Sequence, residues 1–184
     1  NAGNVGIGTT TPNNLLQVFD LIDFNDTDLN TKIGYQAGKN IVSGARNNTF
    51  LGYQAGLSDA ALSTLAADYN TAVGTQALFS NSTGEENTAV GYQSLYYNTA
   101  GSSNTGFGKY SLYNNDSGSG NVAIGYYSGA YETGSDGFYV NNRSRGSSAG
   151  EKAGSLLYGT FNATAANQTL RINASTTVAQ NLTV

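Results

Sequence analysis

The sequence predicts an all-β protein, a parallel β-solenoid or β-roll of about six rungs with flanking β segments, which we expect to be trimeric and fibrous. Three observations predict this fold. A nine-residue motif recurs six times, 24 of the 184 residues are Gly with a single Pro, and only 11% of the residues are charged. Many Gly residues and few charges are typical of short strands that are joined by tight turns.

The repeated motif begins at residues 30, 48, 70, 87, 104 and 121, so the spacings are 18, 22, 17, 17 and 17 residues. A nearly constant period of this length indicates stacked rungs. Each copy starts with Asn and has an apolar residue three positions later, followed directly by Gly, which disfavours a helix. We therefore expect two short strands per rung, joined at Gly and Asn corners. The long second spacing predicts an insertion, a short helical turn or a bulged loop, within residues 57–69.

Rungs stacked about 4.8 Å apart place equivalent residues above one another. The sequence thus predicts a ladder of Asn side chains, a column of Thr side chains beside it, and an apolar core contributed by one residue per rung. The expected Asn ladder contains Asn30, Asn48, Asn70, Asn87, Asn104 and Asn121. The Thr column contains Thr31, Thr49, Thr71, Thr88 and Thr105. The expected rung core contains Ile33, Leu51, Val73, Val90, Phe107 and Ile124.

A narrow solenoid buries little apolar surface, and its Tyr side chains need a surface on which to pack. Association of several chains, three about the long axis, would supply that surface. We expect three segments: an N-terminal β junction segment with an Asp-rich loop (1–29), the β-roll repeats (30–136), and a C-terminal extended β segment with a junction strand (137–184).

Composition excludes several classes of function. The net charge is −4 and the eight Lys and Arg residues are scattered, whereas a nucleic-acid surface needs clustered cations. No apolar run approaches the roughly 20 residues of a membrane span. The chain has no Cys and no His, and so lacks the thiol nucleophile, the usual general base and the commonest metal ligands. We therefore expect neither an enzyme nor a cofactor.

The rungs "NTAVGYQSL" (87–95) and "NVAIGYYSG" (121–129) resemble the heads of trimeric autotransporter adhesins, which are parallel β-rolls with an Asn-x-x-Ala-Ile-Gly repeat. They are also similar to repeats in phage tail fibres and related microbial surface fibres, as are "NVGIGTTTP" (4–12) and the tract 136–174 that ends in "TLRINA". The resemblance implies a β-roll in an extracellular protein, on a cell surface or in a virion fibre.

The two ends of the chain suggest an axial junction. In the fibres that this chain resembles, a strand like "LTV" runs into a short turn and then into "NVGIGT". This chain lacks an initiator Met, and we expect a processed product or a piece of a longer protein. Copies would then meet head to tail, as modules of one polypeptide or as subunits of a filament. The expected junction residues are Asn1, Asn4, Val5, Ile7, Leu182 and Val184.

Two acidic segments are candidate sites. Asp20, Asp23, Asn25, Asp26 and Asp28 have the oxygen ligands that calcium prefers, but the segment lacks the central Gly and final Glu of an EF-hand loop, which favours a solvated loop. The pair Glu85 and Glu86 is reminiscent of a glycosidase. Adjacent residues of a strand face opposite ways, whereas glycosidase carboxyls face each other, so a solvated corner is favoured.

Three further patterns leave alternatives open. The Thr column could form an ice-binding face, but Asn and Ala or Gly neighbours favour turn hydrogen bonds. The Tyr-rich positions could bind sugars or a host protein, or pack between subunits. They include Tyr96, Tyr97, Tyr110, Tyr113, Tyr127 and Tyr131. Nine Asn-x-Ser/Thr sequons occur, at Asn25, Asn47, Asn81, Asn115, Asn142, Asn162, Asn167, Asn173 and Asn181.

These patterns favour a structural subunit or module of an extracellular fibre that assembles laterally and head to tail. The principal alternative is an adhesin or phage receptor-binding fibre head that recognises a host glycan or protein. A polysaccharide-cleaving spike is a third alternative. The expected partner is the chain itself, as a trimer or polymer.

Overall fold

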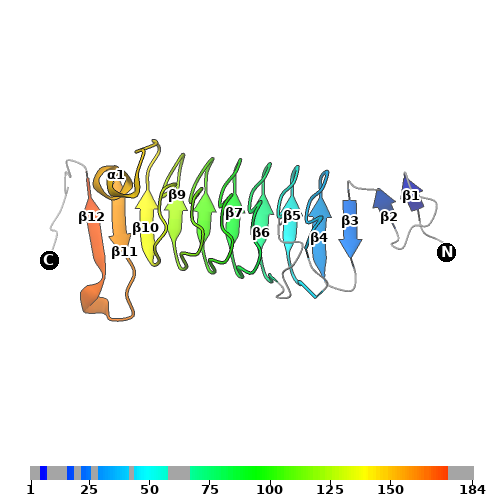
Figure 1. Ribbon diagram of the computed structural model, residues 1–184, viewed down its shortest axis with the longest axis horizontal. Helices are drawn as coiled ribbons and strands as arrows, with labels where there is room; N and C mark the ends of the chain where they lie inside the picture. Colours follow the sequence, from blue (N-terminus) through cyan, green and yellow to red (C-terminus); the bar gives the residue numbers. More distant parts are fainter. Residues whose placement is uncertain are drawn as a thin grey trace, which may run out of the picture.

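The computed structural model describes residues 5–7, 16–18, 22–25, 29–41, 44–57 and 67–173, with side chains from residue 29 onward. Twelve strands pair in chain order into one elongated sheet, with β1 and β12 at its opposite ends (Figure 1). The strands are β1 (Val5–Ile7), β2 (Leu16–Val18), β3 (Ile22–Asn25), β4 (Asn30–Ile33), β5 (Thr49–Leu51), β6 (Thr71–Val73), β7 (Thr88–Val90), β8 (Thr105–Phe107), β9 (Val122–Ile124), β10 (Gly137–Val140), β11 (Leu157–Thr160) and β12 (Thr169–Ile172). A short helix, α1 (Ser148–Gly154), and a 3₁₀ turn, η1 (Ala165–Asn167), complete the fold.

The seven strands β4 to β10 run parallel and are joined by six turns of a β-solenoid, which confirms the predicted all-β solenoid of about six rungs. Equivalent residues pair directly: Thr71 lies opposite Thr88, and Val73 opposite Val90. β3 precedes the solenoid in an antiparallel pair with β4, and β11 and β12 follow it as an antiparallel extension of β10. The register of the rungs is therefore the one that the sequence repeat predicts.

The Asn ladder forms as predicted and lies inside the solenoid. Each side-chain oxygen accepts a hydrogen bond from the equivalent backbone N–H of the next rung. Asn87 Oδ1 accepts from Asn104 N at 3.0 Å, and the last member, Asn121, accepts from Gly137 N at 2.8 Å. Each side-chain amide donates to a carbonyl on the far wall, as Asn104 Nδ2 does to Gly118 O at 2.8 Å. Because both ends of each amide are bonded, these polar side chains are buried without loss of hydrogen bonds.

Two further ladders run parallel to the first. Asn81, Asn98 and Asn115 lie above one another on the opposite wall, and Asn115 Nδ2 donates to Asn98 Oδ1 at 2.8 Å. A Gln ladder lies in the turns and is less buried. Its amides donate from rung to rung, as Gln93 Nε2 does to Gln76 Oε1 at 2.7 Å. The first of these ladders has the same 17-residue spacing as the Asn motif and could have been found from the sequence.

Each rung has a single strand of three or four residues, not the two strands that we predicted. After the strand the chain turns through alternating left-handed residues, as at Gly91 (φ 130°), Gln93 (φ 52°) and Leu95 (φ 52°). Backbone groups there bond to the next rung one at a time, as Gln93 N does to Thr75 O at 3.0 Å. A left-handed residue at every second position prevents an extended strand, so this wall is a stack of turns.

The predicted rung core is wrong. Leu51, Phe107 and Ile124 are 43%, 56% and 44% exposed, and Ile33, Val73 and Val90 are half-buried. All six end a strand whose middle residue points inward, and side chains alternate along a strand, so all six face outward.

In each rung the core consists instead of the middle residue of the strand and one residue of the turn. Where one of the two side chains is large, the other is small. Ala72 and Ala89 face Leu78 and Leu95, all fully buried. One rung earlier the sizes are exchanged, because Phe50 fills the interior opposite Gly56. A Cβ atom added at Gly56 would come within 2.4 Å of the Phe50 ring. The interior is thus too narrow for a large side chain from both walls.

Buried carboxylates end the solenoid at its C-terminal side. Glu132 follows Asn115 in register and accepts hydrogen bonds from Tyr139 Oη and, at 2.8 Å, from Gly134 N. It also forms an ion pair with Lys152 of α1 at 3.1 Å. Glu151, likewise in α1, is fully buried and accepts from Asn141 Nδ2 at 3.1 Å. The segment after residue 137 therefore closes the stack with a helix and is not only the extended β segment that we expected.

The predicted insertion falls largely on residues 58–66, which lie outside the described part of the chain.

Candidate functional site

The outer face of the sheet is the most extensive candidate site. We use "outer face" for two columns of side chains, those of the last residue of each strand from β4 to β10 and of the residue two positions before it. The first column holds Thr31, Thr49, Thr71, Thr88, Thr105, Val122 and Phe138. The second holds Ile33, Leu51, Val73, Val90, Phe107, Ile124 and Val140. The second column is apolar over its whole length, and the first becomes apolar at β9.

The antiparallel strands extend this face. Val140 pairs with Leu157, and Leu157 pairs with Ile172, which is 50% exposed. Contiguous apolar surface of this extent is uncommon in monomeric proteins and is typical of a surface that binds another molecule. The column beside the Thr column is made of apolar side chains of unequal size, some exposed and some half-buried. A flat face with two Thr columns, as ice binding requires, is not present among the described strands.

A column of mainly aromatic side chains borders the outer face, one residue after the Gly of each turn. Tyr35 and Tyr53 stack with their ring centroids 5.9 Å apart. Further along, Lys109 lies between Tyr92 and Tyr126, with its ammonium group 5.4 and 5.9 Å from the two ring centroids. All four Tyr residues are exposed, so the apolar surface widens toward this side.

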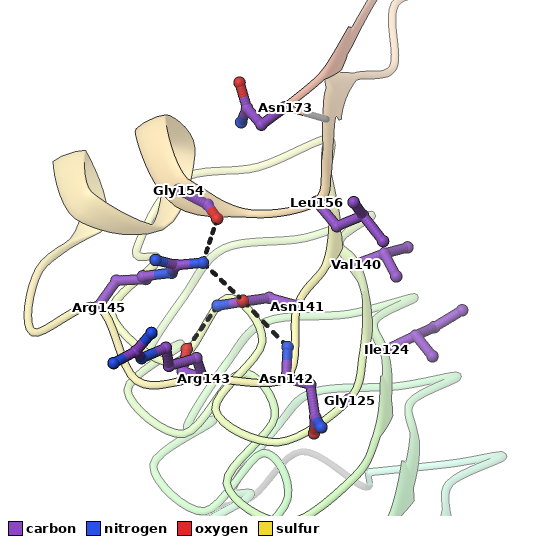
Figure 2. A pocket seen from close by; sticks show the side chains of 10 residues that line it. All are labelled: Ile124, Gly125, Val140, Asn141, Asn142, Arg143, Arg145, Gly154, Leu156 and Asn173. Carbon is purple, nitrogen blue, oxygen red and sulfur yellow. Dashed lines mark hydrogen bonds between the residues drawn. The ribbon is translucent and has the colours of Figure 1, made fainter. Parts of the chain in front are cut away.

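A pocket lies where the outer face meets the C-terminal end of the solenoid. Figure 2 shows Ile124, Val140 and Leu156 pointing to one side of it, with Arg143 and Arg145 at the other. Its volume is about 450 Å³. The pocket thus combines an aliphatic wall with two guanidinium groups.

Hydrogen bonds order the polar side of this pocket. Arg145 Nη2 donates to Gly154 O and, at 3.5 Å, to Asn141 Oδ1, while Asn141 Nδ2 donates to Arg143 O at 2.6 Å (Figure 2). Both guanidinium side chains are exposed, but Arg145 is held against α1 by its hydrogen bond to Gly154 O. The arrangement suits an acidic or polar chain segment with an adjoining aliphatic side chain.

The pKa values of the two buried glutamates, Glu132 and Glu151, are shifted in opposite directions. Burial raises the pKa of Glu151, and the hydrogen bonds from Asn141 and the Arg145 N–H only partly offset this effect. Burial acts in the same direction on Glu132, but Tyr139, Gly134 N and Lys152 together outweigh it, so the pKa of Glu132 is lowered. Glu132 is thus held as a carboxylate, while Glu151 resists ionisation.

The predicted axial junction lies almost entirely outside the described part of the chain. Asn1, Asn4, Leu182 and Val184 are not described, and Val5 and Ile7 are described only as the ends of β1. The Asp-rich segment is likewise described only where Asp23 and Asn25 lie in β3, without their side chains. Among the side chains that are described, no cluster of three or more acidic residues is arranged to hold a metal ion.

Glu85 and Glu86 lie at an exposed corner, where Ser103 Oγ donates to Glu86 Oε2 at 3.1 Å. This is the solvated corner that the sequence favours.

Some sequons lie in the interior ladders. Asn81 and Asn115 are buried and fully engaged, whereas Asn47 and Asn142 are exposed. Sequons at buried ladder positions are a by-product of the Asn-rich repeat.

The predicted Tyr-rich positions gather into one patch on the turn side of the solenoid. Tyr96 and Tyr113 stack at 5.3 Å, and Tyr110 meets both Tyr113 and Tyr127, at 5.3 and 4.6 Å. The structure therefore brings together residues that lie in three successive repeats.

No family model, curated protein or solved structure matches the chain. Within the described residues no helix has the length and apolar character that a membrane span requires.

Proposed function

We propose that this chain is a structural module of an extracellular fibre, which assembles laterally through the outer face and axially through its two ends. The observation that carries the proposal is the apolar column of half-buried and exposed side chains that runs from Ile33 to Ile172 along the outer face. A rigid rod with one continuous apolar side is suited to association with parallel copies of itself.

Lateral association of three copies buries this apolar surface. Each copy turns its outer face toward a common axis, and the bordering Tyr column packs against the neighbouring copy. Because every rung presents an apolar residue at the same level, chains in register bury the column over its whole length. Burial of Phe107 alone, now 56% exposed, removes on the order of 100 Å² from water and contributes about 2 kcal/mol per chain.

Axial association is supported by charge. Residues 1–29 contain four Asp and no Lys or Arg, whereas residues 137–184 contain Arg143, Arg145, Lys152 and Arg171 against Glu151 alone. The exposed Arg143 beside the aliphatic wall would receive the acidic N-terminal segment of the next copy. β12, the last strand of the described sheet, offers its free edge to a further strand.

Light scattering tests the proposal of lateral assembly. A chain that lacks residues 176–184, and with them the axial junction, should form trimers with a mass slightly below about 57 kDa, which is three times the 19.1 kDa of the whole chain. Phe107→Lys in the same shortened chain should lower the mass to that of one chain, because it places a charge in the apolar column. Ala100→Lys, at an exposed position outside both columns, is the control and should keep the assembly. A shortened chain that is monomeric at micromolar concentration without either substitution would refute lateral assembly.

Electron microscopy tests the proposal of axial assembly. Deletion of residues 176–184 should shorten or abolish filaments, and Arg143→Glu should do the same, while Arg143→Lys retains them. Adding Asp23→Arg to Arg143→Glu should restore part of the filament length. Filaments of unchanged length in both the deletion and Arg143→Glu would contradict the axial proposal and leave the lateral one intact.

A further inference from the structure

We propose that the hollow between Tyr113 and Tyr127 on the turn side is a binding site for a neutral sugar residue of a glycan. This site is separate from the outer face and from the C-terminal pocket, and does not rest on the assembly of the fibre. It would give the module an adhesive function in addition to a structural one.

The hollow exists because an aromatic column stops. Phe79, Tyr96 and Tyr113 occupy the same position in successive rungs and stack, with centroids 4.8 and 5.3 Å apart. The next residue in this register is Ala130, since Tyr97 N donates to Tyr113 O and Asn114 N donates to Ala130 O. The missing ring leaves a hollow of about 280 Å³.

Aromatic rings form most of its wall. Tyr110, Tyr113, Tyr127 and Tyr131 line the hollow together with Ala130. Tyr110 meets Tyr113 edge to face, at 89°, so the rings present both faces and edges to the cavity. The C–H groups of a pyranose ring stack on such faces, while the phenol groups remain available to sugar hydroxyls.

Two carboxamides supply further polar contacts. Gln93 is the last member of the Gln ladder, because Tyr110 takes the next position. Gln93 Nε2 is used by Gln76, but within the described chain no donor reaches Gln93 Oε1. Asn114 Nδ2 donates to Ala130 O at 3.0 Å, which leaves Asn114 Oδ1 as a second acceptor. Two acceptors among aromatic rings are the arrangement that orients a polyhydroxylated ligand.

The charge of the hollow selects a neutral ligand. No Lys, Arg, Asp or Glu lines it. Burial, with help from the neighbouring phenols, raises the pKa of Tyr113 to about 12 and also raises the pKa values of Tyr110 and Tyr127. Tyr110, Tyr113 and Tyr127 are therefore neutral at physiological pH, and the lining offers a carboxylate or phosphate no charged partner. Lys109, whose ammonium group lies 5.0 Å from the centroid of the Tyr110 ring, is not among the lining residues. The volume accommodates one ring rather than an extended chain, which indicates a terminal residue.

Saturation-transfer NMR on the assembled wild-type protein tests the site, with lactose, maltotriose and triacetylchitotriose as probes at millimolar concentration. At least one probe should receive saturation. Ala130→Phe restores the missing ring, which the three rungs below already accommodate, and should weaken binding about tenfold or more. Tyr127→Ala should also weaken binding. Tyr69→Ala, an exposed Tyr remote from the hollow, is the control and should leave binding unchanged.

The variants also make a negative result informative. Saturation of none of the three probes by the wild-type protein would overturn the proposal, as would equal binding by Ala130→Phe. A change in the mass of the assembly in Ala130→Phe, without loss of sugar binding, would make the hollow a subunit contact and overturn it too. If Ala130→Phe does not fold, Gln93→Leu, which removes the free acceptor without filling the hollow, replaces it under the same criteria.

Discussion

Removing one side chain from the Asn ladder should destabilise the protein strongly. Asn104 lies in the middle of the stack and is fully buried. Its Oδ1 accepts from Asn121 N at 2.9 Å, and its Nδ2 donates to Gly118 O at 2.8 Å and, more weakly, to Asn98 Oδ1 at 3.3 Å. In Asn104→Ala the Asn121 N–H loses its partner in the interior, whereas the Gly118 carbonyl keeps the hydrogen bond that it accepts from Asn115 Nδ2 at 2.8 Å.

The magnitude follows from the Asn121 N–H. A buried donor without a partner costs about 1–3 kcal/mol, so Asn104→Ala should lower the free energy of unfolding by about 1–3 kcal/mol. Gly118 O and Asn98 Oδ1 add little to this loss because each keeps a hydrogen bond from Asn115 Nδ2, at 2.8 Å in both cases. Against a total stability of about 5–15 kcal/mol, this is a large loss.

Urea unfolding followed by circular dichroism measures this effect. Wild type and variants are compared at one protein concentration, because assembly makes the apparent stability concentration-dependent. Asn114→Ala is the matched control: it removes a half-buried Asn with one hydrogen bond, to Ala130 O at 3.0 Å, and should cost less than about 1.5 kcal/mol. A loss in Asn104→Ala no larger than that of the control would refute the ladder as a source of stability.

Three further predictions concern the rung contacts, the buried carboxylates and the sequons. Gly91→Ala should cost more than the roughly 1–3 kcal/mol of backbone strain, because its Cβ would lie 2.7 Å from the Gly108 carbonyl group. Gly146→Ala, with positive φ but open space, should cost only the strain, as thermal melting would show. The lowered pKa of Glu132 stabilises the fold above its ordinary value of 4.5, and this stabilisation is lost as the pH falls through the folded pKa. Glu132→Gln should therefore weaken the protein at pH 7 and flatten the acid side of the stability curve. The raised pKa of Glu151 acts in the opposite direction, with stability lost as the pH rises above 4.5, so Glu151→Gln should reduce that loss in urea titrations at several pH values. Expression in a glycosylating host followed by peptide mapping should find glycan at the exposed Asn142 but none at the buried Asn81 and Asn115.

The stacking of the rungs could be predicted because the repeat itself encodes it. A constant spacing places Asn70, Asn87 and Asn104 in one column whatever the shape of the rung. The interior hydrogen bonds then follow from the need to satisfy a buried amide. The second ladder, Asn81 to Asn115, has the same spacing and was accessible by the same reasoning.

The direction of the side chains could not be predicted from polarity alone. In a strand such as Thr-Ala-Val, either Ala or the two flanking residues can face inward. The more apolar Val73 and Val90 are the natural choice for a core, but the interior of this solenoid has room for only one large side chain per rung. Leu78 and Leu95 fill that space from the turn, so Ala72 and Ala89 face inward.

The sequence does contain a signal for this arrangement, in the sizes of the middle strand residue and the turn residue that faces it. Phe50 occurs with Gly56, whereas Ala72 occurs with Leu78, six residues later in each case. The exchange of a large and a small residue between two positions indicates that both point into the same confined space. The C-terminal closure by Glu132 and α1 has no counterpart in the repeats, and the repeat therefore did not predict it.

Cross-linking tests most directly whether the outer face joins copies of the chain. The sequence contains no Cys, so Phe107→Cys introduces a single thiol in the apolar column. With a short bismaleimide, Phe107→Cys should give a covalent dimer on a denaturing gel, and Ala100→Cys, outside both columns, should remain monomeric. A dimer from Ala100→Cys and none from Phe107→Cys would contradict assembly through the outer face.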